Sequence, residues 1–166
     1  MENFISSPIG LIHTLFAVLA LITGTIVVLN KKGTRFHKRV GYVYVVSMLL
    51  LNLTAFGIYR LFNGFGMFHA AALLSLLALV GGMYPVLFRH KVKNWYLQHV
   101  KVMGWSVVGL YAAFAAEIGT RLFEEKYFFL TVGVSSFAVI AIGAFFIYRT
   151  KNREARKLKS QKNELN

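Results

Sequence analysis

The sequence predicts an all-α, polytopic membrane protein, folded as a helical bundle with five transmembrane helices. Of its 166 residues, 57% are hydrophobic, and the apolar residues occur in long runs rather than in an amphipathic pattern. Five runs reach the roughly 20 residues that a helix needs to cross about 30 Å of hydrocarbon. These runs are Pro8–Leu29, Val40–Tyr59, Phe65–Phe88, Val100–Leu122 and Tyr127–Tyr148.

Short connections between the runs predict one integral membrane domain over residues 1–149, followed by a basic cytoplasmic tail at 150–166. The first run is expected to be a retained helix, because Met1–Ser7 contains no basic residue of the kind that opens a signal peptide. The chain has no cysteine. Disulfides, thiolate metal sites, iron–sulfur clusters and covalent haem attachment are therefore excluded.

The formal net charge of +13 arises from 19 Lys and Arg residues against 6 Asp and Glu. Sixteen of the 19 fall on one side of the predicted bundle, so the positive-inside rule places the N-terminus outside and the C-terminus in the cytoplasm. This distribution is typical of a topology signal, and no nucleic-acid partner is predicted. The expected contacts are the lipid bilayer and, at the basic tail, anionic lipid headgroups.

Histidines are the most informative residues, because each of the first four apolar runs has one histidine within it or just before it. His13 and His69 lie near the predicted outer ends of the first and third helices, and His37 and His99 near the inner ends of the second and fourth. The alternation predicts two levels of two histidines in a four-helix bundle. Small residues on the His13 face, such as Gly24, would let another helix or a flat ligand approach closely.

The fourth run places a carboxylate on the same face as its histidine. His99 and Glu117 are separated by five helical turns, or about 27 Å. Arg121 lies one turn beyond Glu117, at the spacing of an i,i+4 ion pair. The same stripe contains Met103, Ser106, Leu110 and Ala113. A carboxylate within an apolar span is costly unless it is paired, so Glu117 is a candidate functional residue.

The two halves of the chain resemble one another weakly, with HTLFAVLALITGT from His13 matching HAAALLSLLALVGGM from His69. Each segment is followed by a basic connection and a second histidine. This similarity predicts a four-helix core of two repeated helical hairpins, made by the first and second pairs of helices. The fifth helix, without an ionisable group between Lys126 and Arg149, is expected to be an added packing helix.

The same residues resemble a family of uncharacterised bacterial membrane proteins, catalogued as a domain of unknown function. The resemblance covers about Leu11–Leu122 and includes His13 with its small-residue strip, the segment HKRVGYVY from His37, the histidine of FHAAALLSLLALVGG, and His99 after a basic loop. It implies a location in the cytoplasmic membrane of a bacterium. The histidine arrangement is also similar to that of cytochrome b561-type diheme proteins.

The latter similarity implies b-type haem bound by His13 with His69 and by His37 with His99, for electron transfer across the membrane. An alternative from the residues themselves is a Zn, Cu or Fe site of His13, His69 and Glu117. A third alternative is a non-catalytic structural, assembly or transport subunit that binds no cofactor. No catalytic residue is predicted, and any activity is expected to be redox. A homo-oligomer and a membrane redox partner are both compatible with the sequence.

Overall fold

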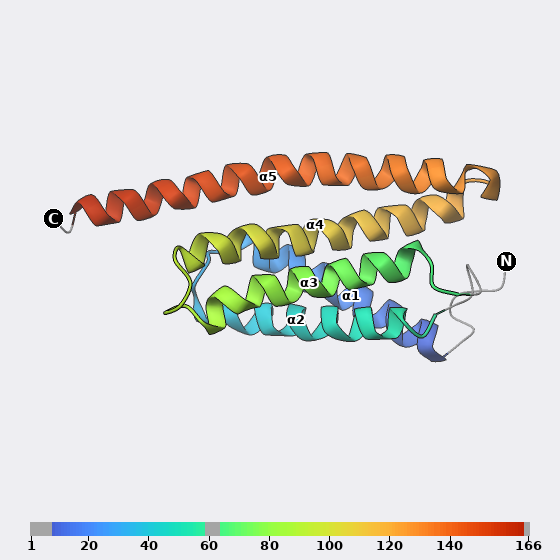
Figure 1. Cartoon of the computed structure of the whole chain (residues 1–166), viewed down its shortest axis with the longest axis horizontal. Coiled ribbons are helices and arrows are strands. Elements are labelled where there is room, and N and C mark those ends of the chain that lie inside the picture. The colour runs from blue at the N-terminus through green and yellow to red at the C-terminus, as the bar shows by residue number, and fades with distance from the viewer. Residues whose placement is uncertain (1–7, 59–63, 165–166) are drawn as a thin grey trace. The chain divides into compact units, whose positions relative to one another are not determined.

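The computed structural model describes residues 8–58 and 64–164, and this part of the chain is all-α, with five α-helices, a short 3-10 helix and no strand (Figure 1). The elements are α1 (Pro8–Leu29), α2 (Arg35–Ala55), α3 (Met67–Leu87), α4 (Trp95–Leu122), η2 (Glu125–Tyr127) and α5 (Phe128–Glu164). The predicted all-α class is thereby confirmed.

Four of the described helices are long and apolar enough to cross a membrane, namely α1, α3, α4 and α5 over Phe128–Ser160. The second run does form a helix, α2, but it does not meet the same criterion. Charged residues at its start, such as Lys38 and Arg39, and the polar Asn52 near its end lower its hydropathy. The structure therefore confirms a membrane protein in contact with the lipid bilayer, while a fifth span remains a prediction.

The chain divides into two compact units, Met1–Leu79 and Val80–Asn166, and the division falls inside α3. The predicted division at residue 149 does not coincide with a helix end, because α5 continues without a break from Phe128 to Glu164.

In the first unit, α1 and α2 pack along each other and are joined by a short connection. Thr34 caps α2, since its side-chain oxygen accepts a hydrogen bond of 3.0 Å from the backbone N–H of His37. Small residues of α1, including Ala20, are buried, as are Tyr44 and Met48 of α2. A hydrogen bond of 3.1 Å from Asn52 to Ser75 joins α2 to α3.

In the second unit, α4 and α5 pack along each other, and η2 forms the connection between them. Glycines bring the two backbones close. A Cβ atom added at Gly119 would lie 2.7 Å from Thr131, and one added at Gly143 would overlap Val108. This close packing of small residues is typical of helix pairs in membranes, where apolar side chains gain nothing by leaving lipid.

The α1–α2 pair agrees with the first predicted hairpin, but the predicted core of two repeated hairpins plus an added helix is not confirmed. The principal partner of α4 is α5, because glycines on both helices allow the close approach. The predicted stripe on α4 also changes along its length. Met103, Ser106 and Leu110 are buried as expected, whereas Ala113 is exposed and its neighbour Ala112 is buried.

Candidate functional site

His13 of α1 forms a hydrogen bond with a residue near the end of α2. Its Nδ1 lies 3.0 Å from the Oγ1 of Thr54. The Thr54 hydroxyl is itself within 2.9 Å of the Leu50 carbonyl and 2.8 Å of the Leu51 carbonyl, and a carbonyl can only accept. The hydroxyl proton is therefore used within α2, and Thr54 accepts from the Nδ1–H of His13. In a neutral ring this tautomer leaves the lone pair on Nε2.

His99 of α4 has the same tautomer for a different reason. Its Nδ1 lies 2.8 Å from the carbonyl oxygen of Gly82 in α3, within the second unit. Because the carbonyl only accepts, Nδ1 carries the proton and the lone pair of the neutral ring is on Nε2. Gly82 also allows α4 to approach, since a Cβ atom at this position would lie 2.8 Å from the Cγ of Met103.

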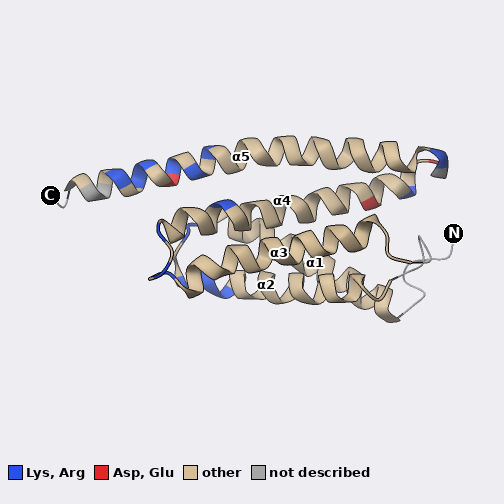
Figure 2. Ribbon diagram, in the orientation of Figure 1, with Lys and Arg blue, Asp and Glu red and all other residues tan. Residues whose placement is uncertain are grey.

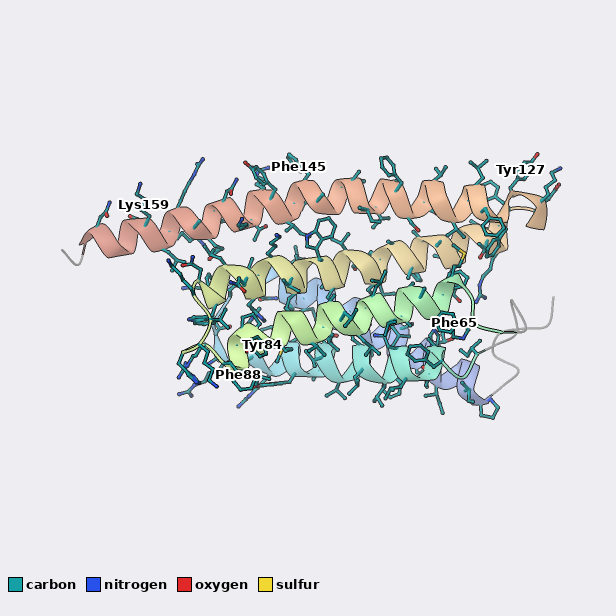
Figure 3. The ribbon with its side chains drawn as sticks, in the orientation of Figure 1. Phe65, Tyr84, Phe88, Tyr127, Phe145 and Lys159 are labelled. Carbon is teal, nitrogen blue, oxygen red and sulfur yellow. The ribbon has the colours of Figure 1, made fainter. Side chains whose placement is uncertain are left out.

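His69, which is 4% exposed, has the opposite tautomer. Its Nδ1 accepts a hydrogen bond of 3.1 Å from the backbone N–H of Gly66, so in a neutral ring the proton is on Nε2. The ring stacks on Phe65, which is labelled in Figure 3, with centroids 5.3 Å apart. The centroid of the Phe56 ring lies 6.2 Å from that of His69. Its Nε2 is buried.

His37 lies in the first turn of α2, where its backbone N–H donates to the Thr34 cap and its Nδ1 is buried. His13 and His69 both contact the opposite end of this helix, through Thr54 and Phe56 respectively. The first unit therefore places these two histidines at one end of α2, and their pairing as ligands at an outer level remains a prediction. His99 belongs to the second unit, so its pairing with His37 remains a prediction.

Glu117 forms an ion pair with Arg121, whose Nη2 lies 2.6 Å from the carboxylate oxygen. The predicted i,i+4 pair is thereby confirmed. The Glu117 side chain is 39% exposed and that of Arg121 is 54% exposed, so the pair is not enclosed by protein. Over residues 8–58 and 64–164 no group of three His, Asp or Glu side chains is placed to hold a metal ion. The set of His13, His69 and Glu117 spans both units and remains a prediction.

Sequence reasoning missed Thr54 and Gly82, the two residues that set the proton position on the predicted ligands. Thr54 could have been found, because it lies near the outer end of the second run, at about the predicted depth of His13. Gly82 could not, because the interaction uses a main-chain carbonyl, which every residue has. A further polar contact, from Tyr96 to Glu154, was also missed.

Neither a search of curated proteins nor a search of solved structures gave a match. The family with the description "Predicted membrane protein (DUF2306)" matches residues 10–151. This range includes all four predicted histidine ligands, Glu117 and the apolar part of α5, and it confirms the resemblance to an uncharacterised membrane protein family. The match covers most of the chain, and the protein therefore belongs to this family of predicted membrane proteins.

Proposed function

We propose that this small integral membrane protein binds b-type haem non-covalently and transfers electrons across the membrane. The observation that carries the proposal is the shared tautomer of His13 and His99. Each ring donates its Nδ1–H to an oxygen atom on a neighbouring helix, at 3.0 and 2.8 Å. Metal-bound histidines almost always donate their other ring N–H to such an acceptor, which fixes the ring and directs Nε2 to the metal.

The donor set fits haem at these two positions. Haem iron accepts neutral imidazole nitrogens, and when bound the haem supplies reversible one-electron chemistry. Because the chain has no cysteine, the haem would be held without a covalent thioether bond, by histidine nitrogens and by packing. Thr54 and the Gly82 carbonyl would hold the proton on Nδ1 and restrict rotation of the rings of His13 and His99.

His69 does not fit as an Nε2 ligand in the conformation described. Its Nδ1 accepts from Gly66, so ligation through Nε2 would require the proton to move to Nδ1 and this hydrogen bond to break. We therefore rank His13 above His69 at the outer level and His99 above His37 at the inner level. At each level the higher-ranked histidine is the one that donates its Nδ1–H to an oxygen acceptor on a neighbouring helix.

A second candidate function is a non-catalytic subunit whose histidines only join helices. The same two hydrogen bonds favour it, because His13 links α1 to α2 and His99 links α4 to α3. Interhelical hydrogen bonds in membranes contribute about 0.6 kcal/mol on average, so either bond is consistent with this role. The metal site of His13, His69 and Glu117 is kept as an alternative to be tested in the same experiment.

The test is a dithionite-reduced minus oxidised spectrum of the purified protein, expressed with haem available. We expect a Soret band and an α-band in the parent protein. His13→Ala and His99→Ala should each reduce haem content, measured as pyridine haemochrome, more than His69→Ala does. The matched control is His90→Ala, because His90 is exposed in the connection between α3 and α4 and should leave haem content unchanged.

A colourless protein would overturn the haem proposal. If elemental analysis then finds a transition metal that is lost in Glu117→Gln, the metal alternative replaces it. If neither cofactor is found and the histidine variants only lower stability, the helix-joining role is supported. An α-band that is unchanged in the double variant His13→Ala/His99→Ala would also contradict the ligand assignment.

The proposed orientation, with the N-terminus outside and the C-terminus in the cytoplasm of a bacterium, is tested independently. Reporter fusions after Gly64 and at the C-terminus should lie on opposite sides of the membrane. Reporters on the same side would contradict the placement of the histidines at two alternating levels.

A further inference from the structure

The C-terminal part of α5 extends well beyond the thickness of a membrane. Its apolar part, Phe128–Tyr148, is about 31 Å long at 1.5 Å per residue, which matches about 30 Å of hydrocarbon. Residues 149–164 continue the same helix for about 24 Å more, whereas a headgroup layer is only about 6 Å thick. An upright α5 would therefore carry this C-terminal extension into the aqueous phase beyond its first turn.

Contacts between α4 and α5 continue into the start of the extension. One antiparallel register runs through the contacts of Gly119 with Thr131, Val108 with Gly143, Gly104 with Ile147 and Tyr96 with Glu154. The Tyr96 hydroxyl donates to Glu154 at 2.7 Å, and the other carboxylate oxygen pairs with Lys157 at 2.7 Å. Since α4 begins at Trp95, these contacts hold α5 against α4 as far as Glu154.

The exposed face of the extension carries arginines. Arg149, Arg153 and Arg156 follow one another at i, i+4 and i+7, and all are exposed. This spacing places them on one stripe of the helix, about 10 Å long. Among the described residues no carboxylate pairs with these arginines, because Glu154 is used by Tyr96 and Lys157. In the second unit, Lys and Arg gather on this part of α5 and on the connection before α4 (Figure 2).

We propose that this arginine stripe is a docking surface for a soluble protein with an acidic patch. Arginine binds carboxylates through two parallel hydrogen bonds, and complementary charge speeds the encounter of transient partners. Lipid headgroups suit the stripe less well, because Arg153 and Arg156 lie beyond them. A nucleic acid also suits it less well, since the stripe is too short for the many phosphate contacts of non-specific binding, and residues 149–166 contain no aromatic side chain for base stacking. The proposal does not depend on haem.

The experiment uses the full-length protein in nanodiscs of zwitterionic phosphatidylcholine, with poly-L-glutamate as the acidic probe. The variant Arg153→Gln/Arg156→Gln removes the two arginines that lie beyond the headgroups. The matched control, Lys91→Gln/Lys93→Gln, removes the same charge from the exposed connection between α3 and α4. We expect the stripe variant to bind the probe about 5- to 10-fold more weakly at low salt, and the control less than about 2-fold.

Equal losses in both variants would overturn the proposal, because they would show a response to net charge alone. A DNA duplex that binds more tightly than polyglutamate, with the same dependence on the stripe, would assign the surface to nucleic acid instead. A loss seen only for Arg149→Gln, on vesicles containing phosphatidylglycerol, would assign it to lipid. Tyr96→Phe should weaken probe binding less than the stripe variant, and circular dichroism should show that each variant stays helical.

Discussion

The α1–α2 and α4–α5 hairpins are both antiparallel pairs in a membrane protein, but they are joined in different ways. In the first unit, polar side chains cross between helices, from His13 to Thr54 and from Asn52 to Ser75. In the second, glycines bring α4 and α5 together, as at Gly143, and the polar contact to Glu154 lies beyond the apolar part of α5. Within the apolar part the α4–α5 hairpin thus packs through glycines, whereas α4 makes its polar contact, from His99 to the Gly82 carbonyl, with α3.

The composition of α2 fits this difference. Among the long helices of the described residues, α2 is the one that does not meet the criterion for a membrane span, and two of its polar side chains are hydrogen-bonded within the helix. Ser47 donates to the Val43 carbonyl at 2.8 Å, and Asn52 to the Met48 carbonyl at 2.7 Å. A helix with such bonds can lie among other helices without exposing polar atoms to lipid.

The largest expected effect comes from breaking the glycine-packed pair. Gly143→Leu should lower the free energy of unfolding by about 3 kcal/mol, because even a Cβ atom at this position overlaps Val108. Unfolding in a titration with denaturing detergent measures the change. Gly133→Leu is the control, since a Cβ atom there meets nothing within 4 Å. Equal effects of both variants would contradict the assigned packing face of α5.

The next effect concerns the polar link between α2 and α3. Asn52→Ala should lower the free energy of unfolding by about 1 to 2 kcal/mol, because Asn52 is 4% exposed and donates to Ser75. A double-mutant cycle with Ser75→Ala should give a coupling energy of about 0.6 to 1.7 kcal/mol. A coupling energy near zero would show that the link contributes nothing to the first unit.

A smaller effect is expected at Thr54, the acceptor for His13. Thr54→Val keeps the shape but removes the oxygen atom, and should lower the free energy of unfolding by about 1 kcal/mol, whereas Thr54→Ser should restore it. The matched control is Thr14→Val, because the Thr14 hydroxyl donates to the Gly10 carbonyl within α1. On the haem proposal, Thr54→Val should also shift the reduction midpoint of the bound haem. Identical results for Thr54→Val and Thr14→Val would argue against a positioning role.

The smallest effect is expected at the ion pair of α4. If the ion pair, whose side chains are 39% and 54% exposed, faces water or headgroups, Glu117→Gln should change the free energy of unfolding by about 0.5 kcal/mol or less. The double variant Glu117→Gln/Arg121→Gln should show an equally small change in the free energy of unfolding, measured by titration with denaturing detergent. A loss of several kcal/mol would instead show that Glu117 lies in an apolar environment and would favour the metal alternative.

The sequence by itself determined which segments form helices and that the protein lies in a membrane. The first run, Pro8–Leu29, agrees with α1 at both ends, because a span is defined by the local length of an apolar run against the thickness of hydrocarbon. The same reasoning predicts that the fifth helix ends at Tyr148, where the apolar residues stop. The helix continues to Glu164 because Lys, Arg, Glu and Ala favour helix and Tyr96 binds Glu154.

Only the tertiary structure decided the partner of each polar group. The sequence placed His13, His69 and His99 on membrane helices but could not show which nitrogen of each ring carries the proton. That depends on whether the neighbouring atom is a hydroxyl already used as a donor, a carbonyl or a backbone N–H. The choice of α5 as the partner of α4 depends in the same way on where glycines meet side chains across the pair. Both are relations between residues far apart in the chain, which the spacing along one helix does not encode.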